Sequence, residues 1–432
     1  MKARNNPYLK RPIKAFWRTS LYAQMSLRSA LIAGRHPASL DATVKAWLKE
    51  NRRDSIRLVL GAGLGNIGDD AMLDRLITHD QDPAVILIPE AHSVLDLDKD
   101  PFVSHLRRNR NNRFLVLPGQ PFLSMNPVVR FNAHRQFGAL CSYADSFEII
   151  GADTMDGGNE SQSLTRFDLL AVATSLGLRT RVYGFSWRAG VPSPIAKRMA
   201  DTARTTQFVL RDPASAERIQ DDGALDILQA ADLVFGLQAT EQPNPDLVRW
   251  VASTATTPVR FAIVNVSGLV SKSVDPVPEY GAVVDALHQA GLRVLFLPHV
   301  IREADSDLPA VRAVFDAYAN QDDYLVEELL TPRQVAWITG RSEIVITGRM
   351  HLAILSIKEG RTPIVLSTAG KVRGMLQLFD LETLAVEPDP GFGQTLTEKV
   401  GVLLPNIERF RTRMKEQLPG VRVLSDRNFA EG

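Results

Sequence analysis

The sequence predicts an α/β protein with two domains, each built on a parallel sheet that helices cover. Three observations support this fold class. Short β-branched runs alternate with helical stretches from about residue 55, a pattern typical of parallel strands joined by crossover helices. The 432 residues are enough for two domains of ordinary size. A polar stretch with two prolines, residues 237–246, predicts a linker between two series of strands.

Each series consists of short apolar runs. The first contains "IRLVL", "AVILIP", "RFLVLPG", "FEIIGAD", "TRVYGFS" and "FVLRD", and it ends near "ADLVFG" at Gly236. The second contains "RFAIVNVSG", "LRVLFLPH", "EIVITG" and "TPIVLS". A last helical segment, "NIERFRTRMKEQL", is expected to pack back across both domains. We therefore expect a basic N-terminal extension (1–50), an N-terminal domain (51–245) and a C-terminal domain (246–432).

The composition excludes several classes of protein. A net charge of +1 gives no overall attraction to nucleic acid. A single cysteine, Cys141, excludes an internal disulfide and a cysteine-cluster metal site, and no HExxH-type spacing predicts another metal site. Apolar runs stay well below the roughly 18 residues that predict a membrane span, and the start lacks the apolar core of a secretory signal. We expect a soluble cytoplasmic protein.

The first 40 residues stand apart because they contain no Asp or Glu. Their basic residues are Lys2, Arg4, Lys10, Arg11, Lys14, Arg18, Arg28 and Arg35. Trp17, Leu21 and Met25 recur at helical spacing, so this segment is interpreted either as a basic helix on the inner face of an anionic membrane or as a packed helix with a solvated basic face. Peripheral membrane contact through residues 1–40 is thus one of two expectations.

The stretch "GAGLGNIGDDAMLDRL", residues 61–76, follows a predicted strand and enters a helix. A glycine turn before a helix favours an anion, but the third glycine is not at the dinucleotide spacing. Asp69 and Asp70 would also repel a pyrophosphate at the helix start. Glu90 comes later than the acid that binds a ribose, expected about 20 residues on. The pattern disfavours a nicotinamide cofactor.

Cationic residues follow two neighbouring strands of the second series. Arg349 and His351 begin a helix directly after "EIVITG", and Lys371 follows "TPIVLS". Positive charge is unfavourable at a helix start because the helix dipole is already positive there. The three residues therefore predict a site for a phosphate or carboxylate, with His351 placed for proton transfer. The alternative for each residue alone is a surface arginine or a half-buried histidine. His299, after "LRVLFLP", is a second candidate for the histidine role.

Several motifs together resemble the polysaccharide pyruvyltransferase family over roughly residues 58–380. They are "GNIGDDAML", the "DGG" of residues 156–158, "LRDPAS", "AADLVF" and "GRMHLAILSIKEGRTPIVLSTAGKVRGML". The resemblance implies two Rossmann-like domains with a cleft between them, similar to B-type glycosyltransferases. It also implies transfer of a pyruvyl group from phosphoenolpyruvate to two hydroxyls of a sugar, which gives a pyruvate ketal on a cell-surface polysaccharide or its precursor. Phosphoenolpyruvate would be a co-substrate, and no cofactor is expected.

The resemblance assigns donor binding mainly to the C-terminal domain. Arg349 and Lys371, with Arg211 and His299, are expected to bind the donor's anionic groups, and His351 is expected to act as general acid. Asp153 or Asp156 would deprotonate the attacking hydroxyl; the alternative for both is a loop residue that hydrogen-bonds nearby backbone.

The N-terminal domain would bind the acceptor. The expected acceptor residues are Asn66, Gly68, Asp69, Gly157 and Gly158. Glycines let the backbone pass close to a sugar, and carboxylates suit hydroxyls. The alternative for Asp69 is a helix cap.

Two other functions remain open at this point. One is a sugar-nucleotide glycosyltransferase of the same architecture, and the other is a non-catalytic binding component of polysaccharide assembly. The acceptor is a sugar or glycan that is lipid-linked, soluble or polymeric, and neither its identity nor the oligomeric state follows from the sequence.

Overall fold

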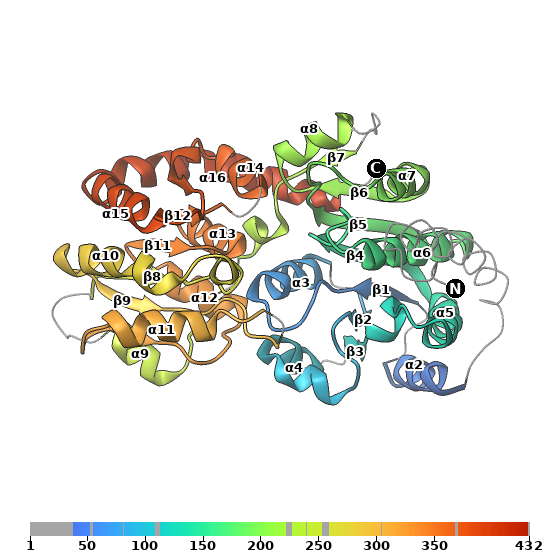
Figure 1. Cartoon of the computed structure of the whole chain (residues 1–432). Coiled ribbons are helices and arrows are strands. Elements are labelled where there is room, and N and C mark those ends of the chain that lie inside the picture. Colours follow the sequence, from blue (N-terminus) through green and yellow to red (C-terminus); the bar gives the residue numbers. More distant parts are fainter. Residues whose placement is uncertain are drawn as a thin grey trace, which may run out of the picture.

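The protein consists of two lobes that lie side by side (Figure 1). The structure is a computed structural model, and it describes residues 38–51, 55–80, 82–108, 113–221, 227–238, 240–252, 259–303, 305–367 and 370–430. The expected basic helix of the N-terminal segment lies outside these residues. The described chain therefore begins with α2 (Ala38–Asn51).

The first lobe is built on a seven-stranded sheet in the order β3-β2-β1-β4-β5-β6-β7. All of its strand pairs are parallel. The strands are β1 Ile56–Leu60, β2 Ala84–Ile88, β3 Phe114–Pro118, β4 Ala144–Ala152, β5 Arg179–Phe185, β6 Gln207–Leu210 and β7 Leu228–Gln229. β1 and β2 are buried along their whole length, which is expected of a sheet that helices cover on both faces.

The helices of the first lobe alternate with these strands. They are α3 Ile67–His79, α4 Pro101–Arg108, α5 Pro127–Cys141, α6 Glu160–Ser175, α7 Ser193–Thr202 and α8 Pro213–Asp221. Asparagine side chains cap the N-termini of α3, α5 and α6, where Asn66, Asn126 and Asn159 accept backbone N–H groups of the first turn. Such caps satisfy donors that have no partner inside the helix, and they fix where each crossover helix begins after its strand.

The second lobe repeats the plan with a six-stranded parallel sheet in the order β10-β9-β8-β11-β12-β13. The strands are β8 Phe261–Val264, β9 Arg293–Phe296, β10 Tyr324–Leu325, β11 Ile344–Thr347, β12 Thr362–Leu366 and β13 Ala385–Val386. The helices are α9 Pro245–Ala252, α10 Pro276–Gln289, α11 Leu308–Tyr318, α12 Pro332–Thr339, α13 Met350–Lys358, α14 Gly370–Gln377, α15 Phe392–Leu403 and α16 Ile407–Asp426.

The strand order reverses beside β1 in the first sheet and beside β8 in the second. Ligands of doubly wound sheets bind at the carboxyl ends of the strands near such a reversal. In this protein those ends face each other. The Ile67 N–H donates to the His299 carbonyl (3.2 Å), and the Ile301 N–H donates to the Gly65 carbonyl (2.8 Å). The loops after β1 and β9 are therefore in direct contact between the lobes.

The C-terminal helix joins the two lobes, as the sequence predicted. α16 extends from the second lobe toward the first, where the C-terminus lies (Figure 1). The Arg75 guanidinium pairs with Asp426 at 2.6 Å, and the ring of Phe429 stacks on His79 with centroids 3.6 Å apart. The last residues of the expected C-terminal domain thus pack on the first lobe.

Two features of the fold differ from the expectation. "ADLVFG" is not a strand: Leu233–Gly236 form a 3₁₀ helix, η3, because the Asp232 side chain accepts the Val234 N–H and caps it. The two-residue strands β7, β10 and β13 were not predicted, because two residues carry no recognisable period.

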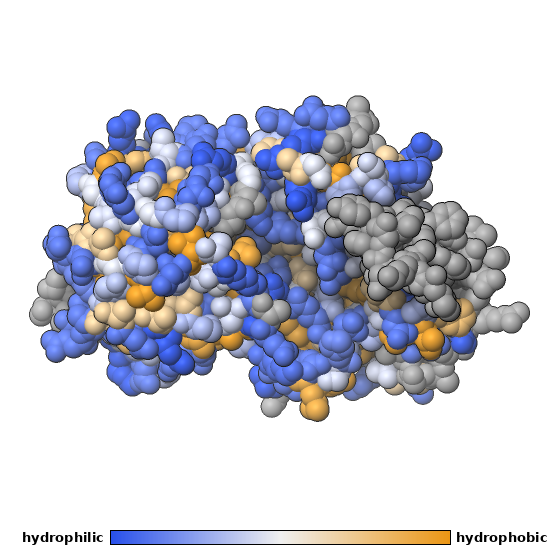
Figure 2. All heavy atoms as spheres, in the orientation of Figure 1, coloured by the Kyte–Doolittle hydropathy of each residue, from blue (hydrophilic) through white to orange (hydrophobic). Residues whose placement is uncertain are grey.

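Hydrophilic residues cover most of both lobes on the face shown in Figure 2, with hydrophobic ones scattered between them. Among the helices of the described residues, none combines the length and the apolar character that a membrane span requires.

Candidate functional site

The predicted cationic residues meet at the edge where the two lobes face each other. Arg349 is the N-cap residue of α13, which follows β11, and His351 lies in the first turn of that helix. Arg211 directly follows β6 of the first lobe. The strand order brings residues far apart in sequence to the interface between the lobes, as predicted for the carboxyl ends of parallel strands; this interface region is called the crevice below.

Arg211 is a buried cation held by two carboxylates. Its side chain is 1% exposed, and Nη2 donates to Asp153 Oδ1 (2.6 Å) while Nη1 donates to Asp232 Oδ2 (3.3 Å). Nε donates to the Ser186 hydroxyl (2.8 Å). Burial alone would lower the pKa of Arg211, but the neighbouring Asp153 and Asp232 raise it above the ordinary value. The guanidinium is thus a fixed positive charge in the crevice.

His351 connects the second lobe to this cluster. Its Nε2 lies 3.2 Å from Asp232 Oδ2 and 3.4 Å from Arg211 Nη1. Burial raises the pKa of Asp232, but His351 and Arg211 lower it and outweigh burial. Asp232 is therefore ionised, and we assign the imidazole proton on Nε2 to the hydrogen bond with it. The other nitrogen, Nδ1, is left for proton exchange.

Gly68 makes room for this imidazole. A Cβ atom at Gly68 would lie 2.1 Å from His351 Nδ1, far inside the contact distance. The backbone of the α3 N-terminus therefore approaches the ring in a way that only glycine permits. Gly68, predicted as an acceptor residue, is brought together with the predicted acid.

Asp153 bridges the two lobes. Besides Arg211, its carboxylate pairs with the Lys371 ammonium of α14. Ala152, which precedes it, has a φ of 44°, a left-handed conformation that is unusual for a residue other than glycine. Burial raises the pKa of Asp153, but Lys371 and Arg211 lower it well below the ordinary range. Asp153 is thus a firmly ionised counter-ion.

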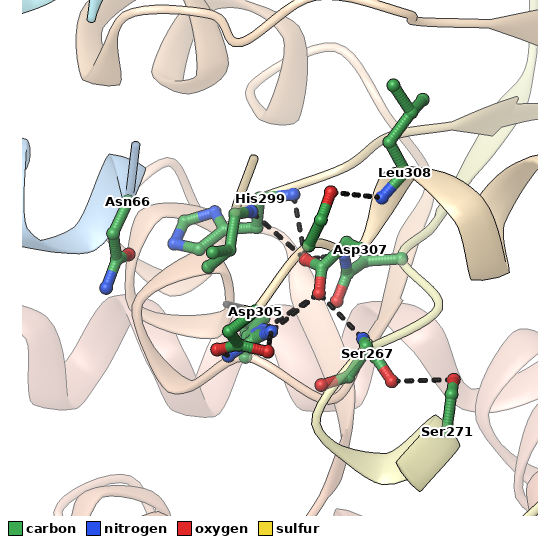
Figure 3. A network of polar contacts seen from close by, with 12 residues as sticks. Asn66, Ser267, Ser271, His299, Asp305, Asp307 and Leu308 are labelled. Carbon is green, nitrogen blue, oxygen red and sulfur yellow. Dashed lines mark hydrogen bonds and ion pairs between the residues drawn. The ribbon is translucent and has the colours of Figure 1, made fainter. Parts of the chain in front are cut away.

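Arg349 pairs with two acids, Asp305 and Asp307, which are labelled in Figure 3. Its guanidinium donates to Asp305 at 3.1 and 3.2 Å and to Asp307 at 2.7 and 3.1 Å. Burial lowers the pKa of Arg349, and Asp307 and Asp305 raise it above the ordinary value. The expectation that this helix start needs an external anion is therefore wrong in its premise, because protein carboxylates already neutralise the charge.

His299 lies beside this second cluster with its ring directed toward Asn66 (Figure 3). The side chain is 1% exposed, and neither ring nitrogen has a hydrogen-bond partner among the residues that the structure describes. Burial, with His351 and Arg349 nearby, lowers the pKa of His299 well below the ordinary value. The ring is a neutral imidazole at the interface of the lobes.

The predicted acceptor residues after β1 lie at the start of α3, where one of them caps the helix. Asn66 Oδ1 accepts the Gly68 N–H (3.0 Å) and is the N-cap of α3. The alternative interpretation of Asp69 as the cap is therefore wrong. Asp70 is 1% exposed, and burial and the neighbouring Asp100 raise its pKa well above the ordinary value. Asp69 is only partly buried.

The turn after β4 contains the other predicted acceptor residues. Asp156 Oδ1 accepts the Gly158 N–H (3.0 Å), and the Ser163 hydroxyl accepts the Gly157 N–H (3.1 Å). Gly157 has a φ of 78°, so a glycine suits this turn. Burial raises the pKa of Asp156. Asp156, Gly157 and Gly158 thus hydrogen-bond within their own loop and form its conformation.

Sequence reasoning found the cations of the crevice but missed the acids that hold them. These acids are Asp232, Asp305 and Asp307. "READSD" follows a predicted strand, so its two aspartates at a carboxyl edge were a usable signal, whereas Asp232 was hidden inside an apparent strand. Among the described residues, no group of three or more His, Cys, Asp or Glu side chains is arranged to hold a metal ion.

Solved structures share this architecture. A UDP-GlcNAc 2-epimerase from Neisseria meningitidis bound to UDP-GlcNAc aligns with a TM-score of 0.55 at 11% identity, covering 86% of this chain and 97% of that one. A UDP-glucosyltransferase from Polygonum tinctorium aligns at 0.54 and 13% identity, over 87% and 97%. A glycosyltransferase from Rickettsia africae aligns at 0.52 and 11% identity, over 88% and 100%. The predicted fold, similar to B-type glycosyltransferases, is confirmed.

Sequence comparison identifies the family. No curated protein sequence matches this chain. A family model described as polysaccharide pyruvyl transferase matches residues 66–370, a range that begins at the N-cap of α3 and includes both arginine clusters except Lys371. Because this match covers most of the chain and of both sheets, the protein belongs to the polysaccharide pyruvyl transferase family.

Proposed function

We propose that the protein transfers a pyruvyl group from phosphoenolpyruvate to two hydroxyls of a sugar, in a polysaccharide or its precursor. The observation that carries this proposal is the position of Asp153 between Arg211 and Lys371. Two cations from opposite lobes there hold one carboxylate. The same pair suits the carboxylate or phosphate of an anionic donor, which would take the place of Asp153.

His351 is placed to act on such a donor. Asp232 orients its Nε2, and Nδ1 faces the α3 N-terminus. In the proposed first step, protonated His351 gives its Nδ1 proton to the methylene carbon of phosphoenolpyruvate while a sugar hydroxyl oxygen bonds to C2 and loses its proton to a base. In the second step, the other hydroxyl bonds to C2, the C2–O bond to phosphate breaks, and phosphate leaves with one proton. The two hydroxyl protons thus end on the methyl group and on phosphate.

Arg349 supports this site from a distance. Its guanidinium holds Asp305 and Asp307, so it ties the start of α13, and with it His351, to the loop between β9 and α11. Its predicted direct contact with the donor would require it to share or leave these acids. We retain Arg349 in the proposal as a positioning residue, which holds the start of α13 against the loop between β9 and α11.

A panel assay tests the proposal. The protein would be incubated with phosphoenolpyruvate and methyl hexopyranosides that carry free vicinal or 4,6-hydroxyls, and with UDP-linked hexoses. Phosphate release that depends on a sugar, with a ketal found by mass spectrometry, is the expected result. Sugar-independent or absent release across the panel, with no binding of phosphoenolpyruvate by calorimetry, would contradict it.

The alternative is a sugar-nucleotide glycosyltransferase, which the fold alone favours because the Polygonum tinctorium protein is a UDP-glucosyltransferase. That function predicts UDP release from a UDP-hexose in the same panel, without consumption of phosphoenolpyruvate. The nucleotide and phosphate measurements therefore separate the two activities directly.

A further inference from the structure

We propose that Asp69 is the base that removes the proton from the attacking sugar hydroxyl. This inference rests on the proposed function and deepens it. Asp69 lies in the first turn of α3, one residue after the glycine that contacts His351 Nδ1. The proposed base and acid would thus come from opposite lobes.

The first rival is Asp153, and its contacts argue against a role as base. It is bound by a guanidinium and an ammonium, and these cations hold its pKa well below the ordinary range. A carboxylate stabilised in this way is a poor proton acceptor, because accepting a proton would leave Arg211 and Lys371 without their counter-ion. Asp153 is better suited to be the group that the donor displaces.

The other acids of the crevice are committed to structural contacts. Asp156 accepts the N–H of its own loop at Gly158. Glu90 accepts the Leu64 N–H (3.1 Å) and the Arg302 guanidinium (3.1 Å). Each would have to give up a bond of its own loop or interface to reach a sugar hydroxyl.

Asp69 differs from these acids in its contacts. Among the described residues, none donates a hydrogen bond to its carboxylate, and the residue is only partly buried. The side chain lies beside the backbone of Gly63, where a Cβ atom would be 2.9 Å from Oδ2. Because this carboxylate is partly exposed and accepts no hydrogen bond from the described residues, it is available to accept one from a ligand hydroxyl.

The electrostatics of Asp69 agree with this role. Burial raises its pKa, as do Glu90 after β2 and Asp153 after β4, while His351 on α13 and Arg302 after β9 lower it. The net effect is a pKa above the ordinary aspartate value. A raised pKa makes a carboxylate a better proton acceptor. Among the charged groups, His351 has the largest effect on Asp69.

The proton balance then closes within the site. Asp69 takes the proton of the first hydroxyl while His351 gives its proton to the methylene carbon. In the second step, protonated Asp69 gives its proton to the leaving phosphate oxygen, and neutral His351 takes the proton of the second hydroxyl. Both groups return to their starting states, and no further acid or base is needed.

Asp69→Asn tests the assignment because it keeps the shape of the side chain and removes its basicity. With any acceptor that the wild-type protein uses, kcat should fall about 100-fold or more, while the calorimetric Kd for phosphoenolpyruvate should change less than threefold. Asp69→Ala should regain part of its activity on addition of formate, which supplies the missing carboxylate. Asp201→Asn, an exposed aspartate of α7 paired with Lys197, is the matched control and should behave as wild type.

The outcomes separate this inference from the proposed function. Equal turnover by wild type and Asp69→Asn, or no effect of formate on Asp69→Ala, would overturn the role of Asp69 and leave the activity intact. Absence of transfer by the wild type would remove the activity and this role with it.

Carboxyl NMR adds a measurement that needs no acceptor. One aspartate resonance should titrate above the ordinary range in the wild type and be missing in Asp69→Asn. An ordinary titration of Asp69 would contradict the assignment.

Discussion

Arg211 and Arg349 both follow a strand of a parallel sheet, and each is held by two carboxylates, but their clusters differ in what they leave available. Arg349 pairs with Asp305 and Asp307 of its own lobe, whose side chains are 13% and 0% exposed. Arg211 pairs with Asp153, which is 47% exposed and is shared with Lys371 of the other lobe.

The difference indicates two roles for similar groups. The Arg349 cluster is closed, because Asp307 also accepts the backbone N–H groups of Gly268, His299 and Val300. Breaking it would leave buried charge without partners. The Arg211 cluster is open on one side, since a ligand anion could replace an exposed carboxylate at little cost. We therefore expect the first cluster to control stability and the second to control donor binding.

The largest expected effect is on stability, from Arg349→Ala. Removing the guanidinium leaves Asp305 and Asp307 without their cation, so the free energy of unfolding should fall by about 3 kcal/mol, the cost of breaking a buried pair. Denaturant unfolding of both proteins measures this difference. Arg249→Ala, which breaks an exposed pair with Asp246, should change little. Unchanged stability of Arg349→Ala would contradict the proposal that the Arg349 cluster controls stability.

His351→Ala should lower kcat about 100-fold or more, the usual loss on removal of a proton-transfer group. The fold should remain intact, because the ring contacts the cluster from the edge of the crevice. Steady-state kinetics with phosphoenolpyruvate, beside a melting curve, measures both effects. Gly68→Ala should reproduce the kinetic loss, because its methyl group would displace the imidazole. Activity within a few-fold of wild type in both variants would make His299 the candidate acid.

His299 should make stability depend on pH. Burial, His351 and Arg349 lower its pKa in the folded state, so below about pH 6.5 the unfolded state binds a proton that the folded state does not. Stability is therefore fully present above that pH and falls as the pH drops from about 6.5 toward about 5.

His299→Gln should remove this part of the acid sensitivity in denaturant unfolding at pH 5 and pH 7. His134, whose pKa burial and Arg130 lower to about 4, contributes equally to both proteins, so their difference isolates His299. The same pH dependence in wild type and variant would show that His299 is not held neutral.

The smallest expected effect is that of Asp153→Asn, which tests whether a donor anion replaces this carboxylate in the Arg211 cluster. Removing the internal carboxylate frees Arg211 and Lys371, so phosphoenolpyruvate should bind a few-fold more tightly, and stability should change by less than about 1 kcal/mol, as expected of a half-exposed pair. Isothermal titration calorimetry measures the affinity. Weaker donor binding would show that Asp153 positions the cations, and a loss of turnover as large as that of Asp69→Asn would restore Asp153 as the base.

Much of the fold was predictable because its signals are local. A run such as "IRLVL" is buried along its whole length, and a central parallel strand needs such continuous apolar character. The edge strand β10 contains only Tyr324 and Leu325, so no period marks it. "ADLVFG" misled the prediction because burial makes both strands and 3₁₀ turns apolar, and only the cap at Asp232 distinguishes them.

The site was predictable in part, for the same reason. The rule that ligands lie at the carboxyl ends of strands placed Arg349, His351 and Lys371 at one edge from sequence position alone, whereas Arg211 was assigned through the family resemblance. What each cation pairs with depends on contacts across long separations: Lys371 and Asp153 are 218 residues apart, and His351 and Asp232 are 119 apart. The residues that flank each partner in the sequence do not indicate which distant residue it pairs with.

The sequence by itself determined the α/β class, the two series of strands and the edge at which the chemistry lies, because burial and helix capping act over a few neighbouring residues. Tertiary structure decided the state of each charge at that edge. It paired Arg349 with two acids, placed Asp153 between two cations, and left the Asp69 carboxylate without a hydrogen-bond donor among the described residues. The physical reason is that the pKa and availability of a buried group depend on which charges the fold brings within a few ångströms, and the chain sequence does not state those neighbours.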